Sequence, residues 1–174
     1  MAASDSIWTT KEIVFAVIAT GIVSAVASWV VDLIKSKYAR HKAALYAAMR
    51  SAVALERYAV DCWDIFSMAE GEYDRHRDVS PQPLPDAPSY PDDVDWKSLD
   101  PSVADEILSF ANGSRIAQSQ AEYARMWENN PFDFQDAAKN RGWRALTLAG
   151  KVRHRYHLGP SRDLDRLWKD LKRD

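Results

Sequence analysis

Residues 13–31 read IVFAVIATGIVSAVASWVV, nineteen consecutive residues without a charge. As an α-helix this stretch is roughly 28 Å long, which is about the thickness of the hydrocarbon core of a bilayer. Charged residues close it on both sides, with Lys11 and Glu12 before it and Asp32 directly after it. We therefore interpret residues 13–34 as a membrane-spanning helix and predict that the rest of the chain is held at a membrane surface.

The charges on either side of this stretch predict its orientation. Lys and Arg close to the end of a span favour the cytoplasmic side of the membrane. Residues 1–12 contain one basic residue, Lys11, so we expect this short N-terminus outside the cytoplasm and the C-terminal domain inside it. A basic group follows the span and is expected at the membrane surface: Lys35, Lys37, Arg40 and Lys42.

A cleaved signal peptide is the alternative to an anchor. Residues 25–27, Ala-Val-Ala, are similar to the A-x-A site at which signal peptidase cuts, and cleavage there would release a secreted helical domain. However, residues 1–12 have no net positive charge, and the apolar stretch continues past the cut and ends in a basic cluster. These two features favour the anchor.

Small and hydroxylated residues lie along one side of the predicted span. Small side chains let two helices approach closely, and hydroxyl groups form hydrogen bonds across such an interface. We therefore predict association of the span with a second copy of the chain or with another membrane protein. The predicted association face consists of Ala16, Thr20, Gly21, Ser24, Ala25 and Ser28.

Composition suggests one soluble domain beside the span. The chain has 174 residues, of which 47% are hydrophobic, and includes seven Trp and seven Tyr for a core. Its net charge of −2 hides a pattern, because residues 33–55 carry +5, residues 56–136 carry −12 and residues 137–174 carry +7. Since the chain as a whole is not basic, we expect no nucleic-acid partner. The single cysteine, Cys62, excludes an intrachain disulfide.

Beyond the span, the sequence predicts an all-α fold. Residues 35–78 contain no proline and one glycine, which favours a long amphipathic helix continuing from the span. Residues 79–101 contain six of the eight prolines and predict an irregular linker. Apolar residues at three- and four-residue steps predict the buried stripe of the long helix, namely Leu45, Met49, Ala52, Val53, Ala59, Val60, Trp63 and Phe66. Within the linker, four residues are expected to hold this segment against the surface of the bundle: Leu84, Tyr90, Val94 and Trp96.

Residues 102–174 predict a helical hairpin and a short C-terminal amphipathic helix that pack with residues 35–78. Asp100 and Pro101 form a helix start, and Gly113 makes a break in that helix plausible. Gly159 and the proline after it are expected to end the second helix. The predicted bounds are 101–128 for the first helix and 134–156 for the second. The C-terminal helix either caps the bundle or lies on a membrane surface.

Candidate chemistry is sparse, and we predict a non-enzymatic protein without cofactor or metal. No phosphate-binding, dinucleotide, zinc-protease or nucleophile-elbow motif occurs in the sequence. Glu56 falls on the apolar stripe, where a carboxylate is costly unless paired, and Trp63 lies two turns further along. These two residues are the candidates for a buried polar site or pocket. Expected partners for Glu56 are Arg115, Arg141 or Arg144.

The order of these parts resembles small uncharacterised bacterial single-pass membrane proteins with a cytoplasmic helical domain. The resemblance rests on the N-terminal span, the basic helix, the linker LPDAPSYPDDVDW and paired helices that end near RYHLGP. It implies the bacterial inner membrane as the location, but no activity and no functional residue. We therefore expect an interaction or assembly module. The alternatives are a small-ligand sensor or regulatory subunit at the membrane and the secreted domain described above.

Overall fold

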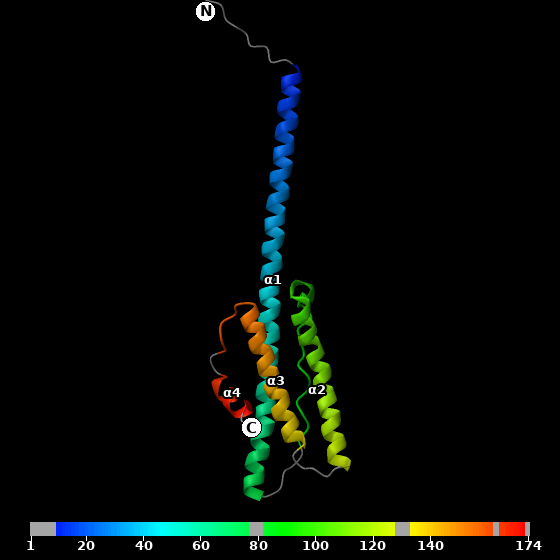
Figure 1. Cartoon of the computed structure of the whole chain (residues 1–174), viewed down its shortest axis with the longest axis vertical. Coiled ribbons are helices and arrows are strands. Elements are labelled where there is room, and N and C mark those ends of the chain that lie inside the picture. Colours follow the sequence, from blue (N-terminus) through cyan, green and yellow to red (C-terminus); the bar gives the residue numbers. More distant parts are fainter. Residues whose placement is uncertain (1–9, 77–81, 128–132, 162–163, 173–174) are drawn as a thin grey trace, which may run out of the picture. The chain divides into compact units, whose positions relative to one another are not determined.

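The fold is all-α, as the sequence predicts. A computed structural model of the chain describes residues 10–76, 82–127, 133–161 and 164–172, and it contains helices but no strand within these residues (Figure 1). The helices are α1 (Thr10–His76), the short 3-10 helix η1 (Trp96–Ser98), α2 (Pro101–Trp127), α3 (Asp133–Arg155) and α4 (Asp165–Lys172).

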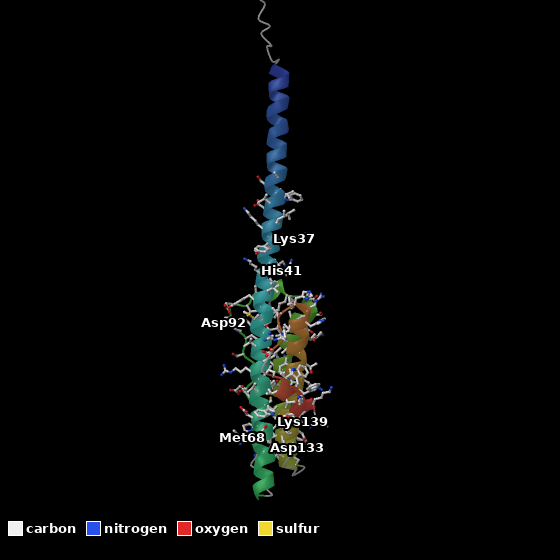
Figure 2. All side chains as sticks on the ribbon, turned by 90° about the vertical axis from the view of Figure 1, so that its left-hand side faces the viewer. Lys37, His41, Met68, Asp92, Asp133 and Lys139 are labelled. Atoms are coloured by element: carbon white, nitrogen blue, oxygen red, sulfur yellow. The ribbon has the colours of Figure 1, made fainter. Side chains whose placement is uncertain are left out.

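The chain divides into two units, Met1–His41 and Lys42–Asp174, and α1 contributes to both. In the first unit, every residue from 27 to 41 is exposed, including Trp29, Ile34 and Tyr38. Figure 2 shows the side chains of Lys37 and His41 projecting from this part of α1. The second unit contains the hydrophobic core, which α1, the linker, α2, α3 and α4 build together.

Among the residues whose side chains the structure describes, no helix has a stretch long and apolar enough to cross a membrane. Residues 13–26 belong to the backbone of α1, but their side chains lie outside the described part of the chain. That segment holds all of the predicted association face except Ser28, which is exposed. The membrane-spanning helix and its association face therefore stay predictions of the sequence.

The buried face of α1 follows a seven-residue repeat of steps of three and four. It is composed largely of small residues, listed here in order: Ala44, Ala48, Ser51, Leu55, Tyr58 and Cys62. The predicted stripe was wrong in part, because Met49 and Val53 are 43% and 52% exposed. The prediction favoured large apolar side chains, whereas alanines allow the neighbouring helices to approach α1 closely.

Helices α2, α3 and α4 agree with the expected hairpin and C-terminal helix. Each start or end that was predicted for α2 and α3 lies within one residue of the observed one. However, α2 continues through Gly113 without a break. Leu164, Leu167 and Leu171 of the C-terminal segment are buried in the core, so α4 caps the bundle in this structure. Trp168 packs edge to face on Trp143 of α3, with ring centroids 5.1 Å apart.

The end of α3 differs from the prediction. His157, with φ of 53°, adopts the left-handed conformation, and Gly159 does not. The amide of Leu158 donates to the carbonyl of Arg153 at 2.9 Å, and the amide of His157 donates to the carbonyl of His154 at 3.3 Å. These two bonds form a Schellman motif that satisfies the last carbonyls of the helix.

The described part of the linker is pinned across the bundle as predicted. Leu84 and Val94 are buried, and the Tyr90 hydroxyl donates a hydrogen bond of 3.0 Å to the carbonyl of Ile107 in α2. The amide of Leu84 donates to the side-chain oxygen of Gln118 at 2.8 Å. Proline removes regular structure from this segment, but apolar anchors and these hydrogen bonds order it.

The linker leads into α2 through Asp100, the capping residue. Its side chain accepts hydrogen bonds from the amide and hydroxyl of Ser102, and these bonds, with one from Arg155, lower the pKa of Asp100 to about 2. The amide of Asp100 donates to the Tyr156 hydroxyl at 2.7 Å. The first turn of α2 is therefore bonded directly to the end of α3.

Candidate functional site

Glu56 on α1 pairs with Arg153 on α3. Arg153 Nε donates to Glu56 Oε1 at 2.5 Å, and Arg153 Nη2 donates to Glu56 Oε2 at 2.9 Å, which is a bidentate geometry. The side chains are only 12% and 19% exposed. Glu56 thus has an arginine partner, but the three predicted arginines were the wrong ones. The spacing of apolar residues on α1 predicts that Glu56 is buried and needs a partner. It does not predict how α3 is aligned along α1, and this alignment determines which arginine reaches Glu56.

A cavity of about 340 Å³ adjoins this ion pair, between α1, α3 and the segment that leads to α4. Arg153 also donates from Nη1 to the carbonyl of Gly159 at 2.8 Å, which ties the turn after α3 to the same pair. Both carboxylate oxygens of Glu56 accept hydrogen bonds from Arg153, so the charged groups of these two residues at the cavity wall neutralise each other. This arrangement is typical of a structural contact rather than of an acid or base in catalysis.

Trp63 is half buried and contacts α4. Its indole Nε1 donates to Asp170 Oδ2 at 3.2 Å. Trp63 does not line the cavity next to Glu56. The structure therefore does not bring the two predicted pocket residues into one site.

The polar site that the sequence reasoning missed is Arg141 on α3, which is 7% exposed. Its Nη2 donates to the carbonyl of Phe110 and to the hydroxyl of Ser114, both at 2.9 Å. The guanidinium carbon lies 4.0 Å from the centroid of the Phe110 ring, which is a close cation–π contact. Gly113 makes this approach possible, because a Cβ there would be 3.1 Å from Arg141 Nη1.

Arg141 has no acidic partner among the described residues. Burial lowers the pKa of Arg141, and the neighbouring charge of Arg144 lowers it further. The Nε–H group is buried without an acceptor in the described structure. A sequence signal for this site existed, since Arg141 lies three residues after Ala138 and four before Ala145, both of which are buried. Glu56 was selected by the same criterion, because it lies three residues after Val53 and four before Val60.

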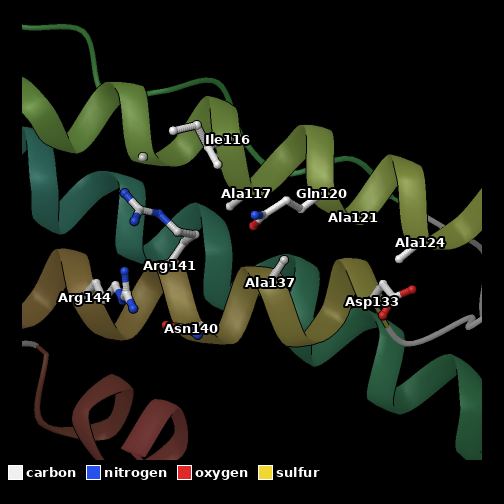
Figure 3. A pocket seen from close by; sticks show the side chains of 11 residues that line it. Ile116, Ala117, Gln120, Ala121, Ala124, Asp133, Ala137, Asn140, Arg141 and Arg144 are labelled. Atoms are coloured by element: carbon white, nitrogen blue, oxygen red, sulfur yellow. The ribbon is translucent and has the colours of Figure 1, made fainter.

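Two adjoining cavities of about 500 and 690 Å³ lie along α2 and α3, and Gly113, Arg141 and Arg144 line both of them. We name the space that they form the α2–α3 groove. Figure 3 shows the first cavity, with Arg141 and Arg144 toward one end and Asp133 toward the other. Ala117, Ala121 and Ala137 lie between these ends, and Ala124 lies at the Asp133 end.

Cys62 is fully buried on the α1 face next to Gly142 of α3. Burial raises the pKa of the Cys62 thiol to about 12, so very little of it is thiolate at neutral pH. We expect the folded protein to resist iodoacetamide at pH 8 and the urea-unfolded protein to react fully, as mass spectrometry would show. Equal labelling rates in the two states would contradict the burial.

The surface residues selected from the sequence are exposed. Lys35, Lys37, Arg40 and Lys42 have exposed side chains. On the outer side of α1, an exposed row of apolar residues contains Tyr46, Met49 and Val53.

In the described part of the chain, no three His, Cys, Asp or Glu side chains converge as ligands for a metal ion. No protein-family model, curated protein or solved structure matches the chain with significance.

Proposed function

We propose that this protein is a non-enzymatic assembly module, anchored by one transmembrane helix in the bacterial inner membrane with its helical domain in the cytoplasm. The anchor rests on the uncharged stretch of residues 13–31, and the orientation rests on the basic group that follows it. The partner is a second copy of the chain or another membrane protein. The association face in the span and the outer side of α1 make the contacts.

The observation that carries the assembly role is the exposed apolar row on α1. Tyr46, Met49 and Val53 are 40%, 43% and 52% exposed, although the helix that bears them is packed on its other side. Spacings of three and four residues place them on one side of the helix, which is the pattern of a surface that binds another helix. Exposed apolar side chains that occur singly are common, but a row at helical spacing favours an interface.

The two polar candidates on α1 support a non-enzymatic role. Glu56 is neutralised by Arg153, and Trp63 donates to Asp170, so both side chains have structural partners. A general acid or base needs a group that can change its protonation state next to a substrate. Both carboxylate oxygens of Glu56 instead accept hydrogen bonds from Arg153.

Photo-cross-linking in native membranes tests the assembly role. With a photoreactive amino acid at Val53, or within residues 16–28 of the span, we expect covalent dimers or a complex with one other membrane protein. Asp105, which is exposed on α2, provides the control position and should give little product. A chain that stays monomeric from all of the test positions would contradict the proposal.

The anchor has a separate test. We expect the full-length protein to remain in the membrane fraction after extraction with alkaline carbonate, and to keep its original N-terminus. Recovery from the periplasm or culture fluid with a new N-terminus near Ser28 would establish the secreted form instead.

A further inference from the structure

We propose that the α2–α3 groove binds a small oxyanion attached to an apolar body, such as a carboxylate or a phosphate monoester, with the charged end at Arg141 and Arg144. This inference concerns a ligand site inside the helical domain. It does not depend on the assembly role or on the membrane anchor.

The first argument is the uncompensated charge of Arg141. A buried ion is costly unless a group of opposite charge accompanies it. The groups that face Arg141 are a carbonyl, the hydroxyls of Ser114 and Tyr58 and the face of the Phe110 ring, and each of these supplies only partial negative charge. An oxyanion in the groove would supply the formal charge that the described residues around Arg141 do not.

The second argument is the position of Arg141 within the groove. It lines both cavities, so its guanidinium is buried among protein atoms and yet borders space that a ligand can occupy. Arg144, one helical turn further along α3, lines the same two cavities and is exposed. A guanidinium is suited to planar oxyanions, because its donors match carboxylate and phosphate geometry.

The third argument concerns the rest of the ligand. Beyond the two arginines the first cavity is lined mainly by alanines, together with the uncharged amides Gln120 and Asn140, and its volume of about 500 Å³ lies in the range of small-molecule sites. Asp133 lines the other end, so both cationic side chains lie at one end of the cavity (Figure 3). The groove is therefore suited to a ligand with one anionic end and a short, mainly apolar body.

Isothermal titration calorimetry on the full-length protein in a nonionic detergent tests this site. The probes are hexanoate, hexyl phosphate, hexanol and inorganic phosphate. We expect saturable binding of at least one of the two six-carbon anions, and at least about tenfold weaker binding of hexanol and of inorganic phosphate. Hexanol lacks the charge, and inorganic phosphate lacks the apolar body.

Two arginine variants distinguish this site from general attraction to positive charge. Arg144→Gln should weaken binding of the six-carbon anion about tenfold, because it removes one charged donor from the groove. Arg115→Gln removes an exposed arginine of α2 that does not line either cavity, and should leave the affinity unchanged. Neither side chain is buried, so both variants should fold, which circular dichroism checks.

A third variant tests the apolar part of the site. Ala137→Leu places a larger side chain at the half-buried lining of the first cavity and should abolish binding while the fold is retained. Three results would each overturn the proposal. They are the absence of binding for both six-carbon anions, equal affinities for hexanol and the anions, and an Arg144→Gln variant that binds as tightly as the original protein.

Discussion

Replacement of Arg153 with methionine should lower the free energy of unfolding by about 3 kcal/mol. The substitution leaves the carboxylate of Glu56, which is 12% exposed, without the two hydrogen bonds that it accepts from Arg153. The unpaired charge then remains desolvated, and this penalty is larger than the net contribution of the pair itself. Urea denaturation followed by circular dichroism measures the change.

Two further variants separate this effect from simple loss of packing. In the double variant Glu56→Met with Arg153→Met, most of the lost stability should return, since apolar side chains of similar length replace the whole pair. Lys151, which lies on α3 like Arg153, forms an exposed pair with Glu106 of α2, and Lys151→Met should cost less than about 1 kcal/mol. If the double variant were as unstable as Arg153→Met, the unpaired carboxylate would not be the cause.

Gly142→Ala should destabilise the protein by about 1–3 kcal/mol. Gly142 lies where α3 crosses α1, and a Cβ there would be 3.0 Å from Cys62 Cβ and 3.2 Å from Leu171 Cδ1. Cys62 Cβ is attached directly to the α1 backbone, so the contact is relieved only if the two helices separate. This cost exceeds the gain of up to about 1 kcal/mol in helix propensity that alanine brings. Thermal denaturation shows the sign of the change.

Gly150 provides the matched control on the same helix. A Cβ there would lie 3.6 Å from the nearest atom, on the ring of Trp168, which is an ordinary van der Waals contact. Gly150→Ala should therefore stabilise the protein by a few tenths to about 1 kcal/mol through helix propensity. If both alanine variants raised the melting temperature, the helix crossing at Gly142 would not be tightly packed.

The helix bounds were predictable because the signals that set them are local. Asp100 and Pro101 act on the turn that they begin, and the apolar spacing of α3 is contained within one helix. The buried face of α1 was less predictable, because alanine is a weak indicator of burial on its own. Met49 and Val53 are more apolar than Ala48 and Ser51, yet the latter two face the core. Tertiary packing therefore decided which side of α1 is buried.

The candidate site was predictable only in part, because its pairings depend on how separate helices align. The sequence indicated that Glu56 needs a positive partner, but Arg153 is 97 residues away and became that partner through the packing of α3 on α1. Arg141 occupies a buried position in its own helix, although its sequence position suggested only a partner for Glu56. One of its acceptors is the backbone carbonyl of Phe110. Because every residue has such a carbonyl, the residue types in the sequence do not indicate which one Arg141 contacts.

The junction at Asp100 joins two segments that are far apart in the chain, the start of α2 and the end of α3. Ser102 and Arg155 donate hydrogen bonds to the carboxylate of Asp100, and the Tyr156 hydroxyl accepts a hydrogen bond from the backbone amide of Asp100. The start of α2 and the end of α3 are therefore joined by shared hydrogen bonds. Unfolding of either helix end must break the bonds from Asp100 to Arg155 and Tyr156, which also hold the other end. Because the bonds from Ser102 and Arg155 lower the pKa of Asp100 to about 2, its carboxylate stays charged in mild acid, and the stability that these bonds contribute is lost only as the pH falls toward that value.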